Sequence, residues 1–123
     1  MTQEDKELLL KDLCARLPYG VKIKLIRWDI DEGMYINTTL EPDDIERLLN
    51  VEEDDTEIKP YLFPLSSMTD KQKDEYQYIT ERWMNDPAYS ISDSIDWLNK
   101  NHFDYRGIIE KGLAIDATGL NVY

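Results

Sequence analysis

The hydrophobic and polar positions change period several times along the chain, and each period predicts an element. Leu9, Leu13 and Leu17 recur at helical spacing between charged residues. This pattern predicts an amphipathic helix of about fourteen residues. Thr2 is a suitable N-cap, and Pro18 stops the helix because proline has no backbone N–H to continue the hydrogen-bond pattern.

A β-hairpin is predicted over residues 21–40. Apolar residues alternate with lysines from Val21 to Leu25, which is the period of a half-buried strand, and residues 34–40 favour a second extended segment. The apolar parity shifts at Ile26. Either a β-bulge or cover on both faces of the strand explains the shift.

The remaining chain predicts further helices and one extended segment. Helical patterns are predicted over 42–50, 70–84 and 92–101, and in a short stretch that Asp104 caps. Residues 58–65 contain two prolines, which do not suit a central strand, so we expect either an edge strand or a buried extended segment there. The order of elements indicates an α+β fold, with a small antiparallel sheet (hairpin 21–40 plus segment 58–65) packed against about five helices. We expect one globular domain over residues 1–123.

Composition narrows the classes of protein. The chain has 123 residues, of which 41% are hydrophobic, with 14 Lys+Arg against 26 Asp+Glu and a net charge of −12. It has no apolar run of the roughly 18 residues that a membrane span needs. Its single cysteine, Cys14, excludes an internal disulfide framework, and we expect it to be a buried apolar residue. The acidity argues against direct binding to a nucleic-acid backbone.

The negative charge is concentrated in the middle of the chain. Residues 41–75 carry twelve acidic and four basic side chains, and the densest run is Glu52, Glu53, Asp54 and Asp55. Such a run favours a solvated loop. It also suits docking of a basic protein partner or mimicry of nucleic-acid phosphates. Tyrosine is enriched at interfaces, and four tyrosines could border the same surface: Tyr61, Tyr76, Tyr78 and Tyr89.

An alternative polar site surrounds the only histidine. His102 could act as a general base with Asp96 or Asp104 nearby, and Arg106 follows in the same segment. The other interpretation is an inter-helix turn in which Asp104 caps the next helix and Arg106 pairs with an acid. The spacing of these residues indicates no metal site, and the sequence contains no motif for a cofactor.

Lys22 and Lys24 lie on one face of the first predicted strand. They could form a small basic patch with nearby tyrosines. The simpler interpretation is a solvated sheet face that also protects an edge from pairing.

Two strings carry a resemblance to a known family: Ile-Lys-Pro-Tyr-Leu-Phe-Pro-Leu-Ser-Ser-Met-Thr at 58–69, and Asp-Trp-Leu-Asn-Lys-Asn-His-Phe-Asp-Tyr-Arg-Gly-Ile-Ile-Glu-Lys-Gly-Leu-Ala at 96–114. Both resemble a family of small acidic proteins of gut Bacteroidetes that often lie in prophage-like or mobile segments. No activity is established for that family, so the resemblance implies no site residues. It implies a bacterial cytoplasm and an accessory role in a mobile element.

These observations lead to one main hypothesis about function. We expect a non-enzymatic protein-interaction module that binds a protein partner through its acidic, tyrosine-rich surface. The alternatives are a small enzyme or metal-dependent protein that uses His102, and an acidic mimic of nucleic acid. The sequence leaves self-association into a homo-oligomer open.

Overall fold

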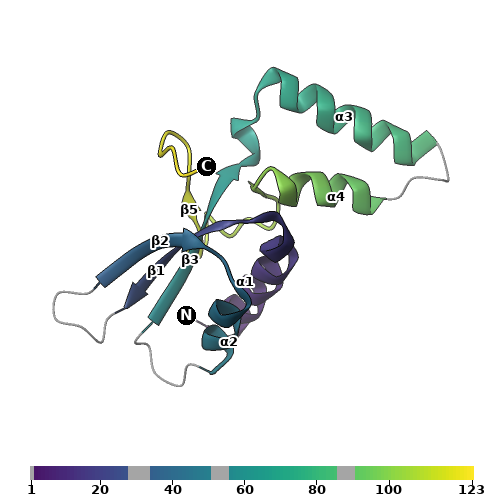
Figure 1. Cartoon of the computed structure of the whole chain (residues 1–123). Helices are drawn as coiled ribbons and strands as arrows, with labels where there is room; N and C mark the ends of the chain where they lie inside the picture. The colour runs from purple at the N-terminus through teal and green to yellow at the C-terminus, as the bar shows by residue number, and fades with distance from the viewer. Residues whose placement is uncertain (1, 28–33, 51–55, 86–90) are drawn as a thin grey trace.

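The computed structural model describes residues 2–27, 34–50, 56–85 and 91–123, and it has an α+β fold (Figure 1). Five strands form one sheet in the order β2-β1-β3-β4, with β5 also paired to β3. The strands are β1 (Lys22–Arg27), β2 (Met34–Thr39), β3 (Thr56–Pro64), β4 (Phe103–Asp104) and β5 (Ile115–Asp116). The α-helices in the described residues are α1 (Gln3–Arg16), α2 (Pro42–Asn50), α3 (Asp70–Asn85) and α4 (Ile91–Lys100). Two short 3₁₀ helices, η1 (Leu17–Tyr19) and η2 (Leu65–Ser67), follow α1 and β3.

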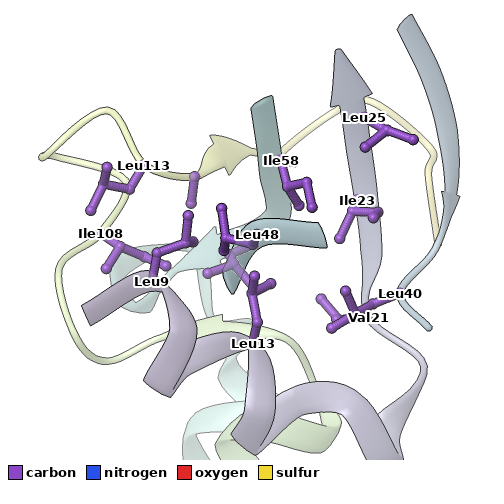
Figure 2. Packing of buried hydrophobic residues seen from close by; sticks show 12 residues of the cluster. Leu9, Leu13, Val21, Ile23, Leu25, Leu40, Leu48, Ile58, Ile108 and Leu113 are labelled. Atoms are coloured by element: carbon purple, nitrogen blue, oxygen red, sulfur yellow. The ribbon is translucent and has the colours of Figure 1, made fainter. Parts of the chain in front are cut away.

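The hydrophobic core lies between one face of the sheet and the helices α1 and α2 (Figure 2). Leu9 and Leu13 of α1 are fully buried there, as the helical spacing predicts. Alternate residues of the strands and apolar residues of α2 and of the C-terminal segment complete the cluster: Val21, Ile23, Leu25, Leu40, Leu48, Ile58, Leu62, Ile108, Leu113 and Ala114. Each large aliphatic side chain in such a core contributes about 1.5–3 kcal/mol by leaving water.

The predicted helix starts are confirmed by their caps. Thr2 Oγ1 accepts a hydrogen bond from Asp5 N at 3.1 Å. At the start of α3, Thr69 Oγ1 accepts from Gln72 N at 3.1 Å, while Gln72 Oε1 accepts from Thr69 N at 2.9 Å. This reciprocal pair is a capping box, and it satisfies two amides that have no partner within the helix.

The hairpin pairs without a bulge. The antiparallel register of β1 and β2 runs unbroken from Lys22 opposite Thr39 to Arg27 opposite Met34. Ile26 is half-buried on the face opposite Leu25. The shift in apolar parity therefore comes from partial cover of both faces. The turn predicted between the two strands lies outside the described residues.

Of the two alternatives for segment 58–65, the structure has the buried extended segment rather than the edge strand, and the sheet is mixed rather than antiparallel. β3 pairs with β1 in the antiparallel sense and with β4 and β5 in the parallel sense. Pro60 lies opposite Ile23. Val21 O accepts a hydrogen bond from Leu40 N, so these two residues are a hydrogen-bonded pair between β1 and β2. Such pairs alternate along an antiparallel ladder, so the backbone groups of Ile23 also face β2, and Ile23 and Pro60 form a pair without hydrogen bonds. The missing N–H therefore costs the ladder nothing.

The fifth helix, predicted after Asp104, does not form. The backbone at Gly107 has φ +74° and at Gly112 φ +75°, and these left-handed conformations interrupt a right-handed helix. Between them lies a single turn closed by bonds from Gly112 N to Ile109 O and from Leu113 N to Ile108 O, both 3.0 Å. This pair of bonds is the pattern of a Schellman motif. The described residues therefore contain four α-helices rather than about five.

Candidate functional site

The helices α3 and α4 form a hairpin that projects away from β1, β2 and α2 (Figure 1). α4 is anchored in the molecule, because Ser94, Leu98 and Asn99 are buried. By contrast, none of the side chains described between Asp70 and Arg82 of α3 is buried, and α3 packs mainly on α4. The side chains described over residues 70–82 of this 16-residue helix thus add little to the core.

Aromatic contacts hold the hairpin together. The Trp97 ring stacks on Phe103 with centroids 5.7 Å apart and planes 12° apart, which ties α4 to β4. On its other side, Trp97 meets Tyr76 of α3 at 5.6 Å. Thr80 Oγ1 and Ser94 Oγ lie 3.5 Å apart further along the two helices. Trp97 therefore fixes the position of α3 relative to the sheet.

A groove of about 340 Å³ lies between α3 and α4, lined by Ile79, Arg82, Asp93, Asp96 and Trp97. Ile79 and Trp97 provide apolar surface, the two aspartates supply carboxylates, and Arg82 adds one positive charge. Partial burial raises the pKa of Tyr19 in η1, and the nearby carboxylate of Asp96 raises it further. Apolar surface beside carboxylates suits a side chain with an aliphatic stem and a cationic end.

Only part of the predicted acidic, tyrosine-rich surface lies at this hairpin. Tyr78 on α3 is 61% exposed, with the Arg82 guanidinium 5.3 Å from its ring centre, and Tyr76 is half-buried against Trp97. Tyr61 is 5% exposed, and its hydroxyl donates to Asn37 Oδ1 at 2.6 Å. It therefore offers almost no area to a partner, because β3 is an interior strand. The remaining predicted residues lie outside the described ones: Glu52, Glu53, Asp54, Asp55 and Tyr89.

The alternative site of His102, Asp96, Asp104 and Arg106 is not assembled as one cluster, since each side chain has different surroundings. Asp96 is exposed and lines the groove between α3 and α4. The Asp104 carboxylate accepts from the amides of Arg106 at 3.2 Å, Ile108 at 3.1 Å and Ile109 at 3.0 Å. Arg106 Nη1 donates to Asp12 at 2.8 Å. Asp104 thus caps a turn, and Arg106 pairs with an acid, as the simpler interpretation predicts.

His102 lies two residues after the end of α4, and its backbone is left-handed, with φ +64°. Its ring stacks on Tyr123 with centroids 3.8 Å apart, and its Nδ1 atom is buried without a hydrogen bond to the described residues. Burial, followed by the nearby positive charge of Arg16, lowers the pKa of His102 to about 4. The imidazole is therefore neutral at pH 7.

A buried ionic cluster joins α1 to the C-terminal segment. Arg16 is fully buried and donates to Asp12 Oδ2 at 2.8 Å and to the carbonyl oxygen of Phe103 at 2.6 Å. The second oxygen of Asp12 accepts from Arg106. The guanidinium groups of Arg16 and Arg106 both lie near the Tyr105 ring, at 5.3 and 4.5 Å from its centre. This cluster fixes the segment on which His102 and Asp104 lie.

Sequence reasoning missed the buried ion pair of Asp12 and Arg16 and the groove between α3 and α4. Asp12 and Arg16 follow Leu9 and Leu13 at intervals of three, so a helical projection puts all four on one face, and this pattern could have identified a buried pair. The groove has a weaker signal, because its residues come from two helices whose packing the local pattern does not determine. Cys14 was also misassigned: it is exposed on α1, on the side away from the core.

Similarity to known proteins does not indicate a function for this chain. No protein-family model matches the chain, and neither the curated proteins nor the solved structures contain a significant match. No helix of the described residues is long and apolar enough to cross a bilayer. The described residues also contain no group of three or more His, Cys, Asp or Glu side chains that could hold a metal ion. Any function assigned to the groove therefore rests on the chain's own residues.

Proposed function

We propose that this protein is a non-enzymatic protein-interaction module that binds a basic segment of a partner protein in the groove between α3 and α4. The observation that carries the proposal is the exposed helix α3, which borders a groove of apolar surface and carboxylates. The net charge of −12 attracts basic partners at long range. The family resemblance adds an accessory role in a mobile element of a bacterial cytoplasm to the proposal.

The groove supports a specific mode of recognition. An arginine or lysine of the partner would lay its aliphatic stem on Ile79 and Trp97 and direct its charge to Asp96. Exposed Tyr78 and Ile95, which is 37% exposed, would supply surrounding contact area. The enzyme hypothesis has less support, because His102, Asp104 and Arg106 are engaged in separate contacts.

The test is capture of partners from bacterial lysate at low and high salt, with matched charge variants. The double variant Asp93→Asn/Asp96→Asn removes the carboxylates of the groove. The control Glu41→Gln/Glu46→Gln changes net charge equally at exposed positions of α2 and just before it, away from the hairpin (Figure 1). Thermal melting of both variants checks the fold.

We expect the wild type and the control to retain the same stoichiometric partner at low salt and to release it at high salt, and the groove variant to lose it. Retention of that partner by the groove variant at unchanged salt sensitivity would show that the groove does not bind it. In that case Tyr78→Ala would test whether the exposed face of α3 binds it instead.

A further inference from the structure

A second surface, remote from the α3–α4 groove, lies at the edge strand β2. β1 pairs with one side of β2, and among the described residues no strand pairs with its other side (Figure 1). Proteins usually protect such edges with charged residues, proline or a bulge. The strand reads Met-Tyr-Ile-Asn-Thr-Thr from Met34 to Thr39 and contains none of these. The lysines of the β1–β2 hairpin lie on β1, which is an interior strand.

The hydrogen-bond alternation shows which backbone groups of β2 face outward. Leu40 N donates to Val21 O at 2.9 Å, so this opposed pair is hydrogen-bonded. Because hydrogen-bonded pairs alternate in an antiparallel ladder, positions 38, 36 and 34 also direct their backbone groups to β1. The N–H and C=O groups of positions 35, 37 and 39 therefore point to the free edge. They form a row that an added strand could pair with.

The sheet face beside this edge is basic, although the whole chain carries a net charge of −12. Lys22 donates from Nζ to Thr39 Oγ1 at 2.6 Å, so its ammonium group reaches across to β2. Lys24 lies opposite Asn37 on one side and Lys59 on the other, which places all three lysines on one face. Glu57 approaches Lys59 at 3.4 Å and offsets part of the charge.

The opposite face of β2 is apolar and incompletely covered. Ile36, which lies opposite the buried Leu25, is 47% exposed, and Thr38 beside it is also exposed. A strand added at this edge would meet two different environments at alternate positions: lysines on one face and Ile36 on the other. Its sequence should therefore alternate with a period of two.

We propose that the β2 edge binds an extended acidic segment of a partner protein by strand addition. Main-chain hydrogen bonds to positions 35, 37 and 39 would supply affinity, and alternate side chains would supply specificity. Acidic residues would face Lys22 and Lys24, and apolar residues would cover Ile36. A second copy of this chain fits less well, because β2 carries no acid to meet the lysines.

The test uses two labelled synthetic peptides and fluorescence anisotropy with the full chain. In one peptide glutamate alternates with valine, and in the other lysine alternates with valine. Asn37→Pro removes the central outward N–H of β2. The matched control is Asn37→Ala, which removes the same acceptor of the Tyr61 hydroxyl bond but keeps the N–H.

We expect the acidic peptide to bind at low ionic strength, to weaken as salt is added, and to bind far better than the basic one. Asn37→Pro should weaken it by about tenfold or more, as for the loss of one main-chain hydrogen bond, whereas Asn37→Ala should change affinity by less than about threefold. Lys22→Gln/Lys24→Gln should weaken binding at low salt. Lys71→Gln/Lys73→Gln, an equal charge change at exposed positions of α3, should not.

Amide hydrogen exchange of the wild type keeps the proposal testable if Asn37→Pro does not fold. Bound acidic peptide should newly protect the amides of positions 35, 37 and 39, whereas those of positions 36 and 38 are already bonded to β1. Equal binding of both peptides, unchanged binding by Asn37→Pro, or no new protection at these three amides would overturn the proposal. So would a dimer of the wild type in sedimentation that Asn37→Pro abolishes, because the edge would then bind a second copy.

Discussion

Substitution of Asp12 by alanine tests whether the buried ionic cluster governs the stability of this fold. Asp12 and Arg16 both have side chains with 0% exposure, and Arg106 reaches the same carboxylate with a side chain that is 15% exposed. Asp12→Ala removes the counter-charge of Arg16, whose guanidinium is left with the carbonyl oxygen of Phe103 and the nearby Tyr105 ring. The positive charge then stays buried without a carboxylate.

The expected cost follows from the asymmetry of buried ion pairs. Removal of one partner typically destabilises a protein by about 3–5 kcal/mol, because the other charge is left desolvated and uncompensated. With a urea m value of about 1.5 kcal/mol/M, the midpoint of unfolding should fall by about 2–3 M. The double variant Asp12→Leu/Arg16→Met removes both charges and keeps apolar volume, so it should be more stable than Asp12→Ala. Arg106→Ala should cost only about 1–2 kcal/mol, since Arg106 is partly solvated and Asp12 keeps Arg16.

Equilibrium unfolding in urea, followed by circular dichroism and tryptophan fluorescence, measures all three variants. The reasoning requires the order Asp12→Ala as the least stable, then the double variant, then Arg106→Ala. A loss below about 1 kcal/mol for Asp12→Ala would refute it, because such a value is typical of a solvated surface pair. A double variant less stable than Asp12→Ala would also refute it, since the residual charge could not then be the source of the cost.

Three further predictions follow from other contacts. His102 has a pKa of about 4 in the folded chain against an ordinary 6.5, so the free energy of unfolding should be highest above pH 6.5 and fall as pH drops toward 4. Urea midpoints measured across this range should show the slope, and His102→Asn should reduce it. An NMR titration of His102 centred near 6.5 would contradict the lowered pKa. Asp104→Ala leaves three amides without their acceptor and should cost about 2–3 kcal/mol in urea unfolding; a cost near zero would mean that water replaces the carboxylate. Cys14 is exposed on α1, so Ellman's reagent should modify it in the native protein almost as fast as in urea; strong protection in the native state would contradict its placement.

The elements predicted from local pattern agree best with the structure. The caps at Thr2 and Thr69 and the apolar stripe of Leu9 and Leu13 depend on residues three or four apart, which the sequence displays directly. The hairpin predicted over 21–40 is present, since β1 and β2 pair in the antiparallel sense. These features depend on residues close together in the sequence, so the sequence pattern predicts them.

The features that were wrong or left open depend on contacts between distant segments. The prolines of β3 left an edge strand and a buried segment both open, because its parallel partners Phe103 and Ile115 lie far along the chain. The stretch after Asp104 was predicted as a helix from its cap and its apolar residues, yet two left-handed glycines shape a turn there instead. Asp12 and Arg16 were passed over because charged residues are rarely buried unless paired, and the pairing comes from the C-terminal segment. Of the predicted site residues, Asp96 lines the groove and Tyr76 and Tyr78 lie on α3, and the groove itself could be found only from the packing of two helices.

The bonds that join α1 and the start of β1 to the last segment also determine when the fold can be completed during synthesis. Arg16 and Phe103 are separated by 87 residues, Arg106 and Asp12 by 94, and Lys22 and the Tyr123 hydroxyl by 101. At roughly 5–20 residues per second, a ribosome needs on the order of 5–20 s to make the intervening chain. During that interval α1 has formed its apolar face but has neither the cover of Ile108 and Leu113 nor the Phe103 carbonyl that receives Arg16. The nascent chain is therefore most exposed to aggregation and proteases before residues 103–123 are made, and a ribosome stalled in that interval would hold a chain that cannot close its core.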